Sequence, residues 1–161
     1  MKIDKGKVVL RKVTSQHIDT IIDHRIIFLR EVQGASAPEL ESRLRQFLKK
    51  YLTVSLETDK FVSWIADYKN RPVGFGGMVI REQPGNFELP NGRTGYILNM
   101  YTVKKFRRNG IGTLLFRKLI DEARSRNLDR IELHTTKDGE PIHRQFGFTD
   151  PHDKVLEIII K

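Results

Sequence analysis

The most informative absence in this sequence is cysteine, which does not occur among its 161 residues. Disulfide frameworks, thiolate metal sites, cysteine nucleophiles and redox chemistry on the protein itself are therefore excluded. Long apolar runs are also absent, and none approaches the roughly 20 residues that a membrane-spanning helix needs. A signal peptide has an apolar segment after its charged start. Residues 1–5 form a charged start, but no apolar segment follows them. We expect no membrane-inserted segment and a cytoplasmic location.

Acidic residues are fewer than basic ones, 20 against 29, which gives a formal net charge of +9. Such a surface attracts anions, so a phosphorylated cofactor, an acidic substrate and nucleic acid are all compatible with it. The basic residues are spread along the chain in short clusters, as they are on an ordinary solvated surface. No recognised nucleic-acid-binding motif is present to support nucleic acid as the partner. Internal repeats and linkers are absent too, and we expect one domain over residues 1–161.

Hydrophobic spacing in the first half of the chain predicts one strand, two helices and an antiparallel hairpin. Apolar residues three and four positions apart favour the helices, and β-branched and aromatic residues favour the strands. The sequence Ser36-Ala37-Pro38-Glu39 fits a capping box at the start of the second helix. Glycines in the second arm of the hairpin indicate a bulge or tight packing. The first helix is predicted from an N-cap at Thr14 or Ser15 to about residue 33. The other predicted ranges are 8–13, 36–51, 61–68 and 73–80.

The second half of the chain predicts a loop followed by alternating strands and helices. The ranges are a loop at 81–94, strands at 96–103, 131–135 and 155–160, a helix at 111–126 and a short helix at 138–146. The order β-α-α-β-β-β-α-β-α-β is that of a mixed α/β (α+β) fold, with a crossover helix between parallel strands. The apolar final strand, Val155 to Ile160, would be an edge for pairing if exposed. Monomer and homodimer both remain open.

A glycine-bearing turn, Arg107 to Thr113, joins the 96–103 strand to the helix that follows it. Glycines at 110 and 112 let the backbone approach a ligand closely, and the first helical turn has N–H groups with no intrahelical partner. These donors and the helix dipole favour phosphate. A P-loop is excluded because no lysine follows Gly112, and a dinucleotide fingerprint is excluded because Leu115 stands where its third glycine is required.

The turn resembles the acyl-CoA site of the GCN5-related N-acetyltransferases, the GNAT family. The pattern of that site is Arg or Gln, two residues, Gly, one residue, then Gly or Ala, and it is met here by Arg107, Gly110 and Gly112. The preceding stretch 99–103 and the later stretch 143–148 stand in the order found in that family. The resemblance implies a mixed central sheet of about six to seven strands flanked by about four helices. It also implies an acyltransferase that moves the acetyl group of the cosubstrate acetyl-CoA to a primary amine of a small molecule or peptide by direct attack.

The resemblance assigns roles to individual residues. The glycine turn would hold the CoA pyrophosphate, the end of the preceding strand would pair with the pantetheine arm, and the N–H of Met100 or Tyr101 would polarise the thioester carbonyl. Thr136 stands where many members carry asparagine. No metal is expected, since His134 and His143 lack a third ligand. The expected cofactor-binding residues are Tyr101, Thr102, Val103, Arg107, Arg108, Asn109, Gly110, Ile111, Gly112, Thr113 and Thr136.

His143 takes the place of the tyrosine that usually protonates the departing thiolate in this family. The ordinary pKa of histidine, about 6.5, lies near working pH, so the cationic ring is a candidate general acid. Such help is typically worth about 10²- to 10⁴-fold in rate. In the alternative interpretation His143 is only solvated or hydrogen-bonded, and the chain is an acyl-CoA-binding sensor or regulatory module with little catalytic activity.

The groups that would handle the amine are less defined by the sequence. No Asp or Glu lies in residues 95–103, so water, Glu31 and Glu82 are the candidates for removing its proton, the two carboxylates by the position of their elements alone. Arg25 and Arg30 belong to the helical region that shapes the acceptor pocket in this family. They would suit an acidic acceptor, unless they are ordinary solvated helix charges.

Overall fold

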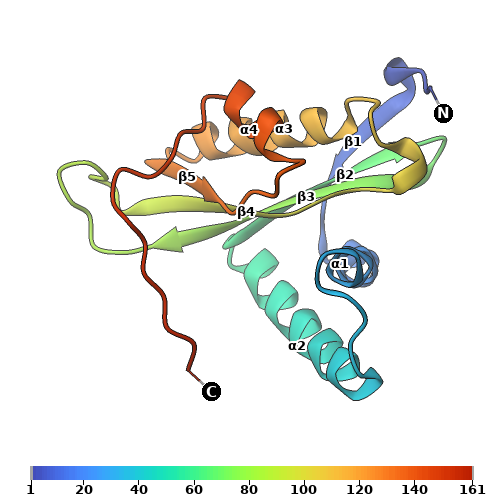
Figure 1. The fold of residues 1–161 in the computed structure, drawn as a ribbon, viewed down its shortest axis with the longest axis horizontal. Coiled ribbons are helices and arrows are strands. Elements are labelled where there is room, and N and C mark those ends of the chain that lie inside the picture. The colour runs from blue at the N-terminus through green and yellow to red at the C-terminus, as the bar shows by residue number, and fades with distance from the viewer. Residues whose placement is uncertain (1, 161) are drawn as a thin grey trace.

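One mixed sheet carries every strand of the structure, a computed structural model that describes residues 2–160 (Figure 1). Its spatial order is β1-β2-β3-β4-β5, antiparallel throughout except that β5 runs parallel to β4. The strands are β1 Val8–Lys12, β2 Phe61–Tyr68, β3 Arg71–Glu82, β4 Arg93–Thr102 and β5 Arg130–Leu133. The helices are α1 Ile18–Gln33, α2 Pro38–Glu57, α3 Ile111–Ser125 and α4 Glu140–Gln145.

Helices cover both faces of this sheet. Figure 1 shows α1 and α2 on one face and α3 with α4 on the other. Ile22 and Leu52 pack with Ile65 under the first pair, whereas Phe116 packs with Val62 on the side of α3. Because β2 is buried on both faces, it is apolar on both, as central strands are. The predicted mixed α/β fold is confirmed.

Glycines of β3 allow close packing on the two faces of the sheet. A Cβ atom at Gly74 would lie 2.7 Å from Cγ2 of Ile111, the first residue of α3. A Cβ atom at Gly77 would lie 2.7 Å from Cζ of Phe61. Real side chains do not sustain such distances, so these glycines let α3 and Phe61 lie directly against the strand.

The same region of the sheet also contains a bulge. Asn99 and Met100 of β4 stand opposite the single Gly76 of β3. Asn99 has a φ of 59°, in the left-handed region that asparagine tolerates better than most residues. A bulge bends its strand and re-aims the neighbouring side chains. Both alternatives predicted for the glycine-rich arm, close packing and a bulge, therefore occur.

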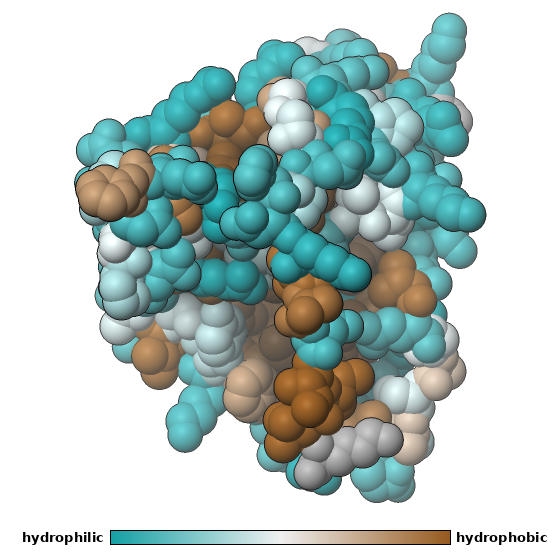
Figure 2. All heavy atoms as spheres, turned by 60° about the vertical axis from the view of Figure 1, so that its left-hand side comes forward, coloured by the Kyte–Doolittle hydropathy of each residue, from teal (hydrophilic) through white to brown (hydrophobic). Residues whose placement is uncertain are grey.

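The predicted final strand is wrong. Residues 155–160 form no strand, and the sheet has five strands rather than six to seven. Val155 and Ile158 are 77% and 83% exposed, and apolar side chains gather on the face drawn in Figure 2. Apolar and β-branched residues fit a pleated surface, but a strand also needs a partner for its backbone groups. Within residues 2–160 no strand pairs with this segment.

Some predicted boundaries also shift. Helix α2 continues to Glu57 instead of ending near Tyr51, and α4 begins at Glu140 rather than 138. The loop predicted at 81–94 is shorter, because β3 extends to Glu82 and β4 begins at Arg93. Each helix within residues 2–160 falls short of the length and apolarity that crossing a membrane requires.

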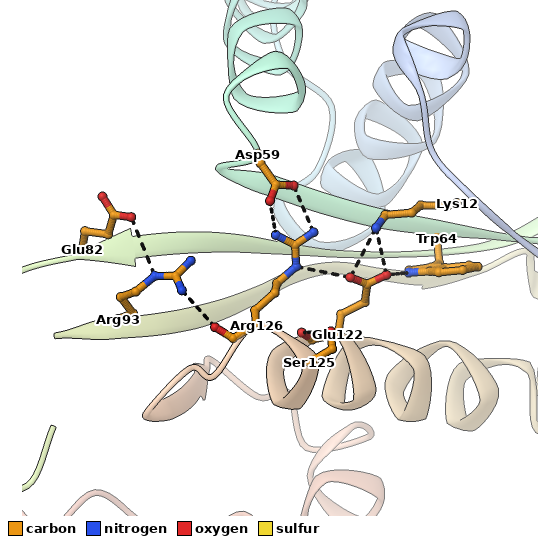
Figure 3. A network of polar contacts seen from close by, with 8 residues as sticks. All are labelled: Lys12, Asp59, Trp64, Glu82, Arg93, Glu122, Ser125 and Arg126. Carbon is orange, nitrogen blue, oxygen red and sulfur yellow. Dashed lines mark hydrogen bonds and ion pairs between the residues drawn. The ribbon is translucent and has the colours of Figure 1, made fainter. Parts of the chain in front are cut away.

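A network of polar side chains around Glu122 joins α3 to the first two strands (Figure 3). The Glu122 carboxylate accepts from Nζ of Lys12 at 3.1 Å and from Nε1 of Trp64 at 3.1 Å. Its other oxygen accepts from Nε of Arg126 at 3.2 Å, and Arg126 also pairs with Asp59 at the end of α2. Burial alone would raise the pKa of Glu122, but Lys12 and Arg126 outweigh it and hold that pKa below its ordinary value.

We predict that Glu122→Gln lowers the free energy of unfolding by about 1–3 kcal/mol, because it weakens bonds to two cations in a partly buried setting. Urea denaturation at pH 7 measures the change. The lowered pKa means that the carboxylate stabilises the fold above pH 4.5, its unfolded value, and loses this effect as pH falls through the folded pKa. The deficit of the variant should therefore shrink at acid pH.

Asp121→Asn is the matched control, since Asp121 lies one position away on α3 with its side chain 54% exposed. We expect it to change stability by no more than about 0.5 kcal/mol. Equal effects of the two substitutions would show that the Glu122 network does not stabilise the fold.

Candidate active site

The N-terminus of α3 has backbone donors that no side chain caps. Gly110 is the N-cap residue, with a φ of 78°, and no side-chain cap hydrogen bond or acidic residue occupies the first turn. The first intrahelical bond of this helix runs from the N–H of Leu114 to the carbonyl of Gly110, at 3.0 Å. The N–H groups before it, at residues 111–113, are those that an anion can use.

Space for an anion is present above this turn. A Cβ atom added at Gly112 would have Oγ1 of Thr102 as its nearest neighbour, at 4.0 Å, so no protein packing requires glycine there. A Cβ atom at Gly110 would lie 3.3 Å from Nζ of Lys5, which places an ammonium beside the turn. Sequence reasoning missed Lys5, because it lies more than a hundred residues away along the chain. The turn thus combines free donors, space and positive charge.

Two residues of the predicted phosphate turn hold the turn in place with their side chains. Asn109 is 8% exposed, and its Oδ1 accepts from the N–H of Ile3 at 3.1 Å. Its Nδ2 donates to the carbonyls of Phe106 and Arg107 at 3.1 and 3.0 Å. Ile111 is 1% exposed and lies in the core against β3. These side chains fix the turn, and the N–H of Ile111 precedes the first intrahelical bond of α3.

The arginines of the turn differ in their surroundings. Nη2 of Arg107 pairs with Oε2 of Glu31 at 2.6 Å, and Nε of Arg107 donates to the carbonyl of Thr102 at 2.8 Å. This ion pair lowers the pKa of Glu31, which makes its carboxylate a weak general base. Arg108 is exposed and has a φ of 63°, so the turn holds a non-glycine residue in the left-handed region two positions before Gly110. Such backbone conformations concentrate at functional sites.

Strand β4 loses its parallel partner halfway along. It pairs with β5 from Thr94 to Ile97 only, and then continues to Thr102 beside β3 alone. Met100, Tyr101 and Thr102, three predicted site residues, lie in this second half. Backbone groups along the open edge need hydrogen-bond partners, and an extended ligand can supply them. Val103 and the 3₁₀ turn Lys104–Phe106 connect this edge directly to the phosphate turn.

His143 lies on α4, on the face of the sheet that α3 covers (Figure 1), with its ring centroid 5.0 Å from that of Phe116 of α3. The hydroxyl of Thr135 donates to the carbonyl of Thr136 at 3.1 Å, so it can accept from Nδ1–H of His143 at 2.8 Å. Burial lowers the pKa of His143, and the charge of Glu140 opposes this only in part. The ring is therefore mostly neutral at pH 7, with Nδ1 protonated and Nε2 able to exchange protons.

Thr136 shapes the turn that leads into α4. Its Oγ1 accepts from the N–H of Gly139 at 3.2 Å, and its carbonyl accepts from the N–H groups of Gly139 and Glu140. This side chain therefore orients the turn that carries His143. His134 does not join His143, because its Nδ1 lies 2.6 Å from the hydroxyl of Tyr96.

Glu82, a candidate base by position, is not brought to this site. It lies at the far end of β3, where it pairs with Arg93 (Figure 3). It also pairs with Lys60, and the hydrogen bond from Lys60 lowers its pKa. Glu31 lies close to the phosphate turn but is bound to Arg107 and to the hydroxyl of Tyr101. The structure thus brings together the phosphate turn, the open half of β4 and Glu31, and leaves Glu82 apart.

Comparisons with known proteins agree with this arrangement. Residues 26–148 match the sequence model of the Acetyltransferase (GNAT) family. No curated protein matches the chain. The solved structure of a predicted acetyltransferase with acetyl-CoA from Clostridium acetobutylicum is 30% identical, with a TM-score of 0.85 over 94% of this chain and 96% of that one.

More distant structures share the fold. A GCN5-related N-acetyltransferase from Ralstonia eutropha JMP134 is 22% identical, with a TM-score of 0.80 over 94% of this chain and 98% of that one. The glucosamine-6-phosphate N-acetyltransferase of Arabidopsis thaliana is 15% identical, with a TM-score of 0.65 over 95% and 99% of the two chains. With the family match over most of its length, this chain belongs to the GNAT acetyltransferase family.

Proposed function

We propose that this protein is an N-acetyltransferase that transfers the acetyl group of acetyl-CoA to a primary amine of a small molecule or peptide. The observation that carries the proposal is the uncapped N-terminus of α3, where Gly112 faces open space beside Gly110. Family membership supports the acyl-transfer chemistry, and the 30% identical structure contains acetyl-CoA. The amine as acceptor, rather than another nucleophile, belongs to the proposal alone.

The donor side of the reaction uses mostly backbone groups. The N–H groups of residues 110–113 hold the pyrophosphate, with Lys5 and Arg108 as nearby positive charges. The pantetheine arm pairs with the open half of β4 near Tyr101 and Thr102, and with Val103 other than through its N–H, which donates to the carbonyl of Val73. This places the thioester beside the bulge, where the N–H of Met100 or Tyr101 donates to the carbonyl oxygen as negative charge develops on it.

Proton transfer completes the reaction. The attacking amine must be neutral, and the departing thiolate must gain a proton. Because Glu31 has a lowered pKa, we route the amine proton through water rather than through this carboxylate. We assign the proton donor to His143, which acts from Nε2 while Thr135 holds Nδ1. Its lowered pKa leaves a small cationic fraction at pH 7, so we place its benefit at the low end of the usual range, about 10²-fold.

The first test is Gly112→Leu. The Cβ atom of the new side chain would have Oγ1 of Thr102 as its nearest neighbour, at 4.0 Å, and leucine is a better helix former than glycine, so the free variant should be about 0.5 kcal/mol more stable. The rest of the leucine side chain blocks close approach of the pyrophosphate, which the alanine that the family pattern accepts at this position would not do. At acetyl-CoA concentrations of about 100 Kd the wild type should gain about 2.7 kcal/mol, seen as a rise in Tm, and the variant should lose most of that gain.

Ser42→Ala is the control for this test. Ser42 is exposed within α2, so the substitution gives a similar gain in helix propensity without touching the turn. Its response to acetyl-CoA should match that of the wild type. A wild type whose Tm does not respond to acetyl-CoA would overturn the proposed function, and an unimpaired Gly112→Leu would remove the phosphate turn from it.

The second test is His143→Ala, followed by release of the CoA thiol in the presence of amine acceptors. We expect kcat to fall by about 10²-fold with the Kd of acetyl-CoA unchanged. Because imidazolium is the donating form, the ratio of wild-type to variant kcat should fall as pH rises through the pKa of His143, which lies below 6.5.

His152→Ala serves as the matched control, since the His152 side chain is 96% exposed near the end of the chain. It should leave kcat unchanged. A ratio that rises with pH would instead assign His143 the role of general base. Tight acetyl-CoA binding without thiol release over a broad amine panel would favour the sensor, the second function that the replacement of tyrosine by His143 makes possible.

A further inference from the structure

Arg25 of α1 is a partly buried cation with no carboxylate partner among residues 2–160. A hydrogen bond runs from its Nη1 to Oδ1 of Asn99, the residue that forms the bulge of β4. Nε of Arg25 is shielded from solvent and has no hydrogen-bond partner within the described chain. A buried donor without a partner and a partly buried charge without a counter-ion both destabilise a protein. The described fold supplies no partner for this donor and no counter-ion for this charge. A bound ligand could supply both.

Carboxylates are present around Arg25 but are used by other cations. Arg30 pairs with Glu41 at 2.6 Å, Arg45 pairs with Asp23 at 2.7 Å, and Lys49 pairs with Asp19 at 3.2 Å. The sequence offered Arg25 and Arg30 equally as binders of an acidic acceptor. The structure separates them, since Arg30 has its counter-ion within the protein and Arg25 has none among residues 2–160.

The groups that face Arg25 are a neutral amide and two phenols. Asn99 lies on β4, and the charge of Arg25 is felt by Tyr51 of α2 and Tyr96 of β4. Burial lowers the pKa of Arg25, and the two phenols offset this only in part. A guanidinium remains charged at any physiological pH. The site therefore presents one positive charge beside an amide and two aromatic side chains. A ligand with a single negative charge would match it.

The position of this charge is as informative as its environment. Asn99 directly precedes Met100 and Tyr101, whose N–H groups are proposed to polarise the thioester carbonyl. His24, which directly precedes Arg25 on α1, packs its ring against Phe75 of β3, with the ring centroids 3.8 Å apart. The guanidinium thus lies at the bulge, on the face of the sheet that α1 and α2 cover. Its hydrogen-bond partner Asn99 is therefore adjacent along β4 to the residue pair proposed to bind the thioester carbonyl.

We propose that Arg25 binds the carboxylate of the acceptor, so that the substrate is an amine of the amino-acid class. This inference rests on the proposed acetyl transfer. A guanidinium binds carboxylate through two parallel hydrogen bonds, and a small rotation of the side chain offers Nε together with one Nη nitrogen for that purpose. A doubly charged phosphate would need more than one cation. Polycationic amines would be repelled by the same charge.

The experiment compares amine acceptors with and without a carboxylate next to the amine, and adds a phosphate-bearing amine and a polyamine. The probes are L-alanine, L-leucine and L-phenylalanine, their α-carboxamides, O-phosphoethanolamine and spermidine, each assayed by release of the CoA thiol. For the wild type we expect kcat/KM to be about 10- to 100-fold higher for the amino acids than for the matching amides. Arg25→Met should remove this difference by raising KM for the amino acids, with the amide values unchanged.

Two further variants keep the result interpretable. Arg30→Met, on the same helix, is the matched control and should preserve the preference of the wild type. Arg25→Lys keeps the positive charge but lacks the two parallel N–H donors of the guanidinium. It should therefore retain part of the preference for amino acids that Arg25→Met loses. The rise of Tm with acetyl-CoA, measured for each variant, reports that the fold and the donor site are intact.

The possible failures are distinct. Wild-type transfer to amides or spermidine as fast as to amino acids would overturn the carboxylate site while leaving acetyl transfer standing. If O-phosphoethanolamine were the preferred acceptor, the group that Arg25 binds would be a phosphate and not a carboxylate. An equal loss on all acceptors in Arg25→Met would reduce Arg25 to a support of the bulge. No transfer to any amine would overturn the proposed function itself.

Discussion

Strand β4 loses its parallel partner after Ile97, and the rest of the candidate site depends on this break. Backbone groups that a neighbouring strand would have bonded are left along the second half of β4, where a ligand can use them. The bulge at Asn99 falls in this half and turns the strand where it meets Arg25. The strand then leads through a 3₁₀ turn to the N-terminus of α3. One interruption of the sheet therefore brings a candidate phosphate turn, an open strand edge and a partly buried cation to the same part of the molecule.

The position of α3 relative to that edge is set by the core. Ile111, its first residue, is 1% exposed and occupies the space that a side chain at Gly74 would need. Glycine in the middle of a strand costs stability, but here it lets the helix begin directly against the sheet. Asn109 then bonds the turn to the N-terminal segment, which also brings Lys5 to Gly110. A ligand-binding turn is thus held by packing and hydrogen bonds that do not involve the ligand.

Local sequence signals predicted the parts of the structure that depend on local chemistry. Proline at the start of α2, the hairpin of β2 and β3, and the glycine turn before α3 all lie where the sequence places them. The prediction of a final strand was wrong because β-propensity is a local property of the sequence, whereas a strand also needs a pairing partner from elsewhere in the chain. The pairs Arg25–Asn99 and Arg107–Glu31 join residues 74 and 76 positions apart, and no local signal reports which of several charged helix residues will meet them.

This difference explains why the sequence predicts a donor side for the proposed site and no acceptor side. The proposed phosphate turn would act through backbone N–H groups, so the sequence signal for it is the glycines that permit close approach. The proposed acceptor side would act through side chains from α1, α2 and β4, whose meeting depends on how two helices pack on a sheet. Arg25 and Arg30 look alike as residues of one helix, and only the carboxylates around them tell them apart. A cation whose charge the fold does not balance is therefore a more specific indicator of the substrate than the net charge of +9.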